Sequence, residues 1–236
     1  MARFRDAITI AEIATGLTAT IDNMEGLVAA ARTLIEAGSF APAFGLSIMS
    51  LEESGKLTAL RAMCQRGGIS GTKWGKLWAS FRSHSYKSSG GLMNCCPDKL
   101  RGDPEIMMSL AFEHAATAEQ IEDSRQWSFY VDFEGETRTW NRPQDFSEQE
   151  ARQALSLAEA ALRRVKSHQQ AGLHSFEALE VMREVYEPLF RELLASDDSG
   201  SAKEVALRAL PYHQEYFRRI SDEGILDPLS EVELLV

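Results

Sequence analysis

The sequence feature that most restricts the fold is a long run of apolar residues spaced three and four apart. Between residues 17 and 35 this spacing places one set of side chains on the same side of a helix: Leu17, Ile21, Met24, Leu27, Val28, Ala31, Leu34 and Ile35. We expect Gly38 to end this helix. A second helix is expected from about Ala41 to Arg66, with Pro42 in its first turn and Gly67-Gly68 after its end. The two helices should form an antiparallel hairpin.

The rest of the chain also carries mainly helical signals. We expect further helices over residues 72–87, 103–125, 147–165, 176–195 and 202–220. Clusters of serine, glycine and proline predict loops at 88–91 and 95–97. The aromatic and β-branched residues 128–133 predict one short extended segment. The sum is an all-α fold, with a four-helix N-terminal core and two or three C-terminal helices packed beside it.

Composition restricts the classes of function. The 236 residues include 35 acids and 25 bases, and the net charge of −10 gives the protein no overall basic field to attract nucleic acid or anionic lipid. Three cysteines do not suit a disulfide framework, and they lack the paired spacing of a zinc site. No signal peptide or membrane span can be read from the sequence, so we expect a cytoplasmic protein without membrane contact.

A charged segment interrupts the apolar face of the second helix. Glu52 and Glu53 stand four and three residues before Lys56, so either acid can pair with the lysine. Gly55 costs about 1 kcal/mol relative to alanine inside a helix, which suggests that another backbone or a ligand comes close there. The alternative is a solvated face of salt bridges.

A second polar group lies at the end of the helix expected over 72–87. Arg82, His84 and Lys87 combine a titratable imidazole with cations that can hold a phosphate. Lys73 and Lys76 extend the group into the one basic stretch of an acidic chain, and the interleaved Trp74 and Trp78 are expected in the core. The alternative is a polar helix end whose basic residues complement the helix dipole.

Several well-known sites are excluded by residue spacing. The segment from Gly71 to Lys76 is not a phosphate loop, because Ser70 stands where the first glycine is needed and Leu77 where Ser or Thr is needed. None of the five histidines follows a glutamate by three residues, as a di-iron bundle requires. The chain also lacks a Gly-x-Ser-x-Gly nucleophile elbow.

Three segments resemble those of one known family. The run from Ala30 to Lys56 is similar to the first helical hairpin of the AbiV abortive-infection family, which belongs to the HEPN superfamily. His84-Ser-Tyr-Lys87 resembles the histidine-lysine motif of that family. The segment beginning at Arg125 and continuing through Tyr130-Val-Asp132 resembles its arginine followed by an aromatic "YVD" segment. Together these segments span about residues 20–135 in the expected order.

The resemblance implies a HEPN-like helical bundle, often dimeric, in an antiphage system that halts the infected cell by attacking RNA or translation. We accordingly expect a HEPN-like bundle over residues 1–135 and C-terminal helices over residues 136–236, packed on the same domain. The leading hypothesis is a metal-independent endoribonuclease without cofactors. It would bind RNA weakly and in a salt-dependent manner, form a homodimer, and respond to a phage-encoded trigger or an inhibitory partner protein.

Roles in RNA cleavage can be assigned on this hypothesis. His84 would be the general base or acid, and Glu53 would orient a cation or the histidine. The phosphate would be held by cations at Lys56, Lys87, Arg82 and Arg125, with Lys73 and Lys76 binding RNA nearby. The competing hypothesis is a non-catalytic helical module that binds a phage or host protein, with the same residues forming a buried polar network.

A second location for the catalytic residues stays open. Many HEPN ribonucleases carry Arg-x(4–6)-His, and both Arg163 to His168 and Arg208 to His213 have this spacing. Chance supplies about one match of this kind in a chain of this composition. Neither pair lies in the segments that resemble the family.

Overall fold

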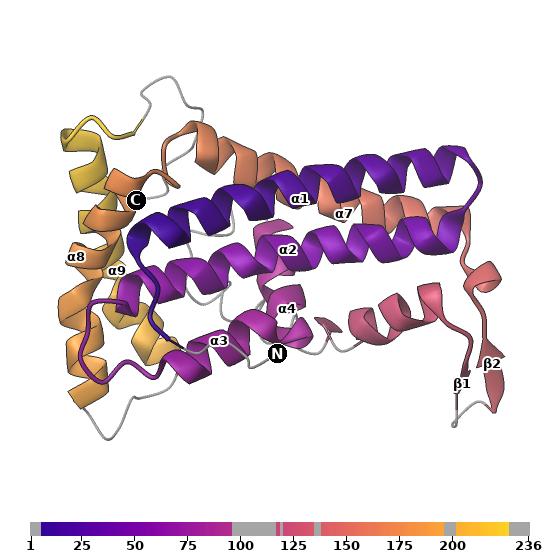
Figure 1. The fold of residues 1–236 in the computed structure, drawn as a ribbon, viewed down its shortest axis with the longest axis horizontal. Coiled ribbons are helices and arrows are strands. Elements are labelled where there is room, and N and C mark those ends of the chain that lie inside the picture. The colour runs from indigo at the N-terminus through magenta and orange to yellow at the C-terminus, as the bar shows by residue number, and fades with distance from the viewer. Residues whose placement is uncertain (1–5, 96–116, 119, 135–137, 196–201, 227–236) are drawn as a thin grey trace.

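The computed structural model describes residues 6–95, 117–118, 120–134, 138–195 and 202–226. The chain is an all-α bundle with one short two-stranded ribbon, so the all-α fold is confirmed (Figure 1). Two of the predicted segments fall partly outside these residues: the helix over 103–125 and the loop at 95–97.

Two long helices form the predicted hairpin. Helix α1 spans Ile10–Glu36 and begins with a capping box, in which Thr9 and Glu12 bond each other's backbone N–H groups. Gly38 has a φ of +73°, the left-handed conformation that ends the helix. Helix α2 then returns from Phe40 to Arg66. The two helices lie side by side along the long axis of the molecule (Figure 1).

The segment expected as one helix over 72–87 is two helices instead. Helix α3 spans Trp74–Arg82, and helix α4 spans His84–Cys95. The chain breaks at Ser83, where ψ is 123°. The loop predicted at residues 88–91 is therefore wrong, because these residues lie inside α4.

Close packing between α2 and α4 explains why Gly55 of α2 and Gly91 of α4 lie inside helices. A Cβ added to Gly91 would lie 2.2 Å from the carbonyl oxygen of Leu51 on α2, and one added to Gly55 would lie 1.9 Å from that of Lys87. The helices can touch backbone to backbone because these positions have no side chain. Packing between the two helices therefore offsets the poor helix propensity of the glycines.

A further helix continues past the predicted boundary at Arg125. Residues 117–118 and 120–129 are helical, and the extended segment begins later, at Asp132. Strand β1 (Asp132–Glu134) pairs antiparallel with β2 (Thr139–Asn141), with Phe133 opposite Trp140. Sequence analysis did not predict β2. A short 3-10 helix, η1 (Pro143–Asp145), leads on to the next long helix.

Three helices complete the structure. Helix α7 (Glu148–Gln170) starts at the predicted capping box of Ser147 and Glu150 and packs along α1 and α2. Helices α8 (Phe176–Ala195) and α9 (Ala202–Asp222) contain Pro188 and Pro211, respectively. They lie across one end of the hairpin (Figure 1).

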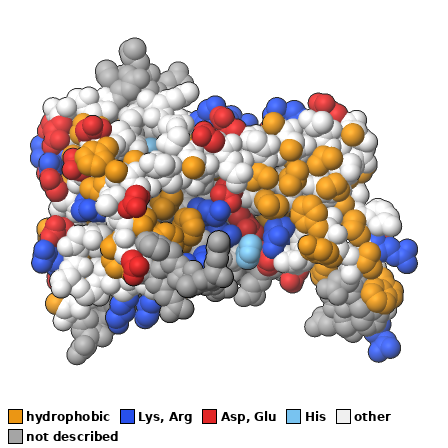
Figure 2. All heavy atoms as spheres, viewed as in Figure 1, with side chains coloured by type: hydrophobic (Ala, Val, Ile, Leu, Met, Phe, Trp, Pro, Cys, Tyr) orange, Lys and Arg blue, Asp and Glu red, His pale blue; other side chains and the backbone are white. Residues whose placement is uncertain are grey.

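One large core joins α1 and α2 to the C-terminal helices. Its fully buried side chains include Leu17, Met24, Leu51, Leu179 and Ile220. Trp74 and Trp78 pack against this core, as predicted. At the opposite end from α8 and α9, apolar side chains gather on the surface (Figure 2). Within the described residues, no helix is long and apolar enough to cross a membrane.

Candidate functional site

Glu52 lies at the centre of a polar cluster in the middle of the bundle. Its side chain is only 5% exposed, because it sits on the helix face that meets other helices. Buried carboxylates require charged or hydrogen-bonding partners. Three partners come from segments far apart in the sequence: His84 and Lys87 from α4, and Arg125 from the helix that includes residues 120–129.

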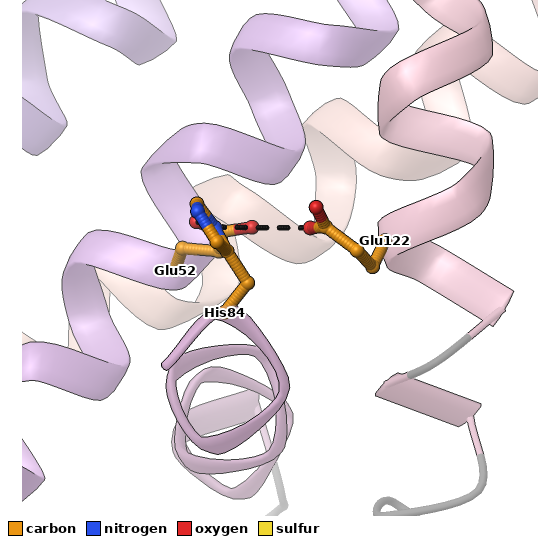
Figure 3. Close-up of side chains that lie close together, drawn as sticks. All are labelled: Glu52, His84 and Glu122. Carbon is orange, nitrogen blue, oxygen red and sulfur yellow. Dashed lines mark hydrogen bonds and ion pairs between the residues drawn. The ribbon is translucent and has the colours of Figure 1, made fainter. Parts of the chain in front are cut away.

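His84 contacts the carboxylate of Glu52 directly. Its Nδ1 lies 2.8 Å from Oε2 of Glu52 and 3.7 Å from Oε2 of Glu122, and the three side chains point toward one another (Figure 3). With Nδ1–H donating to Glu52, the lone pair of the imidazole is on Nε2. The ring is 48% exposed, so Nε2 can meet a substrate while Nδ1 is held by a buried group.

Two cations neutralise the carboxylates beneath the histidine. Nζ of the buried Lys87 lies 3.3 Å from Oε2 of Glu52, and Nε of Arg125 lies 3.3 Å from Oε1. Arg125 also donates two hydrogen bonds to Glu122, at 3.0 and 2.6 Å. This fork geometry is a strong pairing mode of arginine.

The pairing between Arg125 and Glu122 favours the charged form of both groups. The hydrogen bonds to Glu122 raise the pKa of Arg125. Burial alone would raise the pKa of Glu122, but the hydrogen bonds from Arg125 and Gln126 lower it overall. Glu122 and Arg125 are therefore both charged at neutral pH.

The same cluster contains ligand atoms that a divalent cation can use. Glu52, His84 and Glu122 each offer one such atom, and the three lie within 4.8 Å of one another. However, the ammonium of Lys87 and the guanidinium of Arg125 already lie against the two carboxylates. A metal ion would have to displace or repel both, so the charge arrangement disfavours a divalent cation at this position.

Glu53 and Lys56 form a separate pair one turn along α2. Nζ of Lys56 lies 2.5 Å from Oε1 of Glu53 and 5.7 Å from the ring centre of Phe81. Both side chains are partly buried. Of the two acids that could pair with Lys56, the structure thus selects Glu53 and leaves Glu52 to meet His84, Lys87 and Arg125.

The remaining predicted residues lie around this centre. Arg82 is partly buried at the last position of α3, two residues before His84. Lys73 and Lys76 are exposed at the start of α3. The structure therefore brings together His84, Lys87 and Arg125 and places Lys56 with Glu53. It sets Lys73 and Lys76 on the surface.

Sequence reasoning missed two members of the cluster. Glu52 was recognised only as an alternative partner for Lys56, and Glu122 was not considered. A signal for Glu122 exists in its position three residues before Arg125, the spacing at which opposite charges pair on a helix.

The histidines of both Arg-x(4–6)-His pairs contact residues outside this cluster. The ring of His168 packs edge-on against that of His174, with centroids 6.4 Å apart, and Arg163 is exposed. Nδ1 of His213 lies 3.0 Å from the hydroxyl of Tyr186, and Arg208 pairs with Glu192 at 2.7 Å.

The helical bundle and the three motifs within it place the protein in the HEPN class. The AbiV family model of that class matches residues 12–163, which include every residue of the Glu52 cluster. The chain belongs to the AbiV family and is thereby an abortive-infection protein. Searches of curated proteins and of solved structures returned no match.

Proposed function

We propose that this abortive-infection protein is an RNA-targeting toxin that cleaves RNA without a metal ion. The observation that supports the proposal is the 2.8 Å contact between Nδ1 of the half-exposed His84 and the buried carboxylate of Glu52. A carboxylate in this position fixes the tautomer and orientation of an imidazole, so that Nε2 can act as a general base. Glu52 thus takes the orienting role that sequence analysis gave to Glu53.

The proposed step uses the 2′-hydroxyl of the RNA as the nucleophile. Nε2 of His84 accepts the hydroxyl proton while the 2′-oxygen bonds to the adjacent phosphorus. The bond from phosphorus to the 5′-oxygen breaks, and this oxygen takes a proton from water. The products are a 2′,3′-cyclic phosphate and a 5′-hydroxyl, and the histidine later returns its proton to solvent.

The charges around His84 suggest weak RNA binding. Lys87 and Arg125 are already paired with Glu52 and Glu122, so they add little net charge for an incoming phosphate. Arg82 and Lys56 lie closer to the surface, and Lys73 and Lys76 extend the basic stretch along α3. A few exposed cations on a chain of net charge −10 favour weak binding that decreases as salt increases.

The alternative function is binding of a phage or host protein without catalysis. The balanced charges of Glu52, Glu122, Lys87 and Arg125 are also what a structural polar network needs. The exposed Tyr130, Val131 and Trp140 suit a protein partner, such as a phage-encoded trigger or an inhibitory protein.

Incubation of the purified protein with total RNA separates the two functions. We expect cleavage by the wild type with or without EDTA, 2′,3′-cyclic phosphate ends, and loss of cleavage in His84→Ala. His168→Ala is the matched control and should retain cleavage. Intact RNA over a range of pH, together with phage protection by His84→Ala in cells, would favour the binding module and reject catalysis by His84.

A further inference from the structure

An exposed surface of large apolar side chains lies where the helix of residues 120–129 ends and the ribbon begins. Tyr130 is 65% exposed and Trp140 is 58% exposed, and Phe129 and Val131 are exposed beside Tyr130. We call these four residues the ribbon surface. Figure 2 shows apolar side chains that extend to this end of the molecule, with basic side chains beside them. A cluster of large apolar groups on a surface marks a place where another molecule binds.

The ribbon surface lies two helical turns from Glu52. Phe129 packs on Gly45 of α2, where an added Cβ would lie 2.4 Å from Cε2 of the ring. Gly45 is seven residues before Glu52, so the two positions share one face of α2 and are about 10 Å apart along its axis. The helix of residues 120–129 therefore runs along α2, with Arg125 against Glu52 and Phe129 against Gly45.

Hydrogen bonds along the same helix connect the histidine to the ribbon surface. Oε2 of Glu122 lies 3.7 Å from Nδ1 of His84. The side chain of Gln126 donates to Glu122 at 3.0 Å, and its carbonyl oxygen accepts from the backbone N–H of Tyr130 at 3.0 Å. Glu122 and Tyr130 are about 12 Å apart along the helix axis. The ribbon surface is thus close enough to contact the nucleotides next to a bond held at His84.

Two arginines stand on either side of Trp140 in the sequence. Arg138 and Arg142 are exposed, and neither forms an ion pair within the described part of the chain. Arg142 has extended backbone angles, so its side chain leaves the chain on the same side as that of Trp140. Lys87 and Arg125, in contrast, are already paired with carboxylates. The cations that are available to a polyanion therefore lie at the ribbon.

We propose that the ribbon surface, with Arg138 and Arg142, binds single-stranded RNA next to the bond that His84 cleaves. This inference rests on the proposed function and adds the class of RNA. Unpaired bases stack on exposed aromatic rings while arginines hold the phosphates between them. Bases in a duplex stack on one another and do not offer their faces. The two arginines favour a polyanion over a protein partner, because covering an unpaired charge with protein is costly.

Fluorescence anisotropy of a labelled 2′-O-methyl oligonucleotide tests this proposal separately from cleavage. The probe is about ten nucleotides long, within the range of known single-strand sites. It has no free 2′-hydroxyl, so the proposed cleavage step cannot occur and binding alone is measured. The single strand should bind at least about tenfold more tightly than a duplex of the same length. Binding without cleavage of natural RNA would reject the proposed function and leave the RNA surface intact.

Variants of exposed residues locate the binding surface. Trp140→Ala and Tyr130→Ala should each lower the affinity about tenfold, because each removes one stacking ring. Trp140→Phe keeps a ring and should retain most of the affinity. Arg142→Gln should weaken binding and make it less dependent on salt, because one phosphate contact is lost. Leu207→Ala, at an exposed apolar residue of α9, should bind like the wild type.

The proposal is overturned if Trp140→Ala and Tyr130→Ala both bind the single strand as the wild type does, or if the duplex binds equally well. A second copy of the chain is the other occupant of this surface, and it cannot cover Trp140 together with RNA. The oligonucleotide should therefore convert a homodimer into a complex with one chain, as measured by light scattering. A dimer that stays intact with the oligonucleotide bound, but is lost in Trp140→Ala, would assign the surface to the second copy and overturn the proposal.

Discussion

The backbone of Gly55 touches that of Lys87, where α2 and α4 cross. A Cβ on Gly55 would lie 1.9 Å from the carbonyl oxygen of Lys87, a distance that no relaxed structure permits. The crossing sets the ends of Lys87 and His84 against Glu52, one turn earlier on α2. The close approach that the sequence predicted at Gly55 is thereby confirmed, and the neighbour is a backbone.

Gly55→Ala should destabilise the protein by about 1–3 kcal/mol, because the two helices must move apart. The matched control is Gly26→Ala on α1, where an added Cβ meets nothing within 4 Å. That change should stabilise the protein by about 0.5–1 kcal/mol through helix propensity. Urea unfolding measures both, and equal effects of the two variants would contradict the close contact.

Glu52→Gln should abolish phage protection and lower RNA cleavage by about 10²-fold or more, because His84 loses the group that orients it. The adjacent change Glu53→Gln removes only the ion pair with Lys56 and should retain most of the activity. Protein level and melting temperature must be compared for both variants. Loss of protection in a folded Glu53→Gln protein, with Glu52→Gln active, would assign the role to Glu53.

Stability should decrease as the solution becomes acidic. Burial lowers the pKa of His174 from its ordinary value of 6.5 to about 3, and the charge of Arg61 is a second, smaller cause. Between these values the unfolded chain takes up a proton at His174 and the folded chain does not. The free energy of unfolding should therefore fall by about 1.4 kcal/mol per pH unit below pH 6.5 for this residue.

His174→Gln tests this assignment by urea unfolding between pH 7 and pH 4. The variant should show a shallower dependence on pH than the wild type. The pKa of His213 is also lowered, so the stability of His174→Gln should still depend on pH. Adding His213→Gln should reduce this dependence further. Identical slopes in the wild type and His174→Gln would contradict the prediction.

We expect a homodimer that forms through the exposed apolar surface near the ribbon. Phe129, Tyr130, Val131 and Trp140 are exposed there, and apolar groups clustered on a surface are typical of interfaces (Figure 2). Tyr130→Ser combined with Trp140→Ser should give a monomer of 26.3 kDa by light scattering. Leu207→Ser on α9 is the control and should leave the dimer intact. A wild-type protein that is monomeric at every concentration would reject this expectation.

Apolar periodicity was sufficient to predict the helices whose contacts are local. The hairpin of α1 and α2 and the bounds of α8 follow from spacing and caps in the sequence. Residues 88–91 were misread because serine and glycine are common in turns, whereas here their small size permits contact with α2. Such a contact depends on a partner helix that the local sequence does not specify.

The centre of the site could be predicted only in part for a similar reason. Glu52 and Glu53 are adjacent and differ by about 100° around the helix axis, and the sequence does not say which direction faces α4.

The residues of the Glu52 cluster come from segments far apart in the sequence, so the cluster is completed late during synthesis of the chain. The α1–α2 hairpin has local contacts and can form as soon as Arg66 has left the ribosome. Glu52 meets His84 only after α4 has been synthesised, and it meets Arg125 later still. A growing chain therefore lacks the complete site, and a protein whose proposed target is RNA becomes competent only after the segment that carries Arg125 has been synthesised.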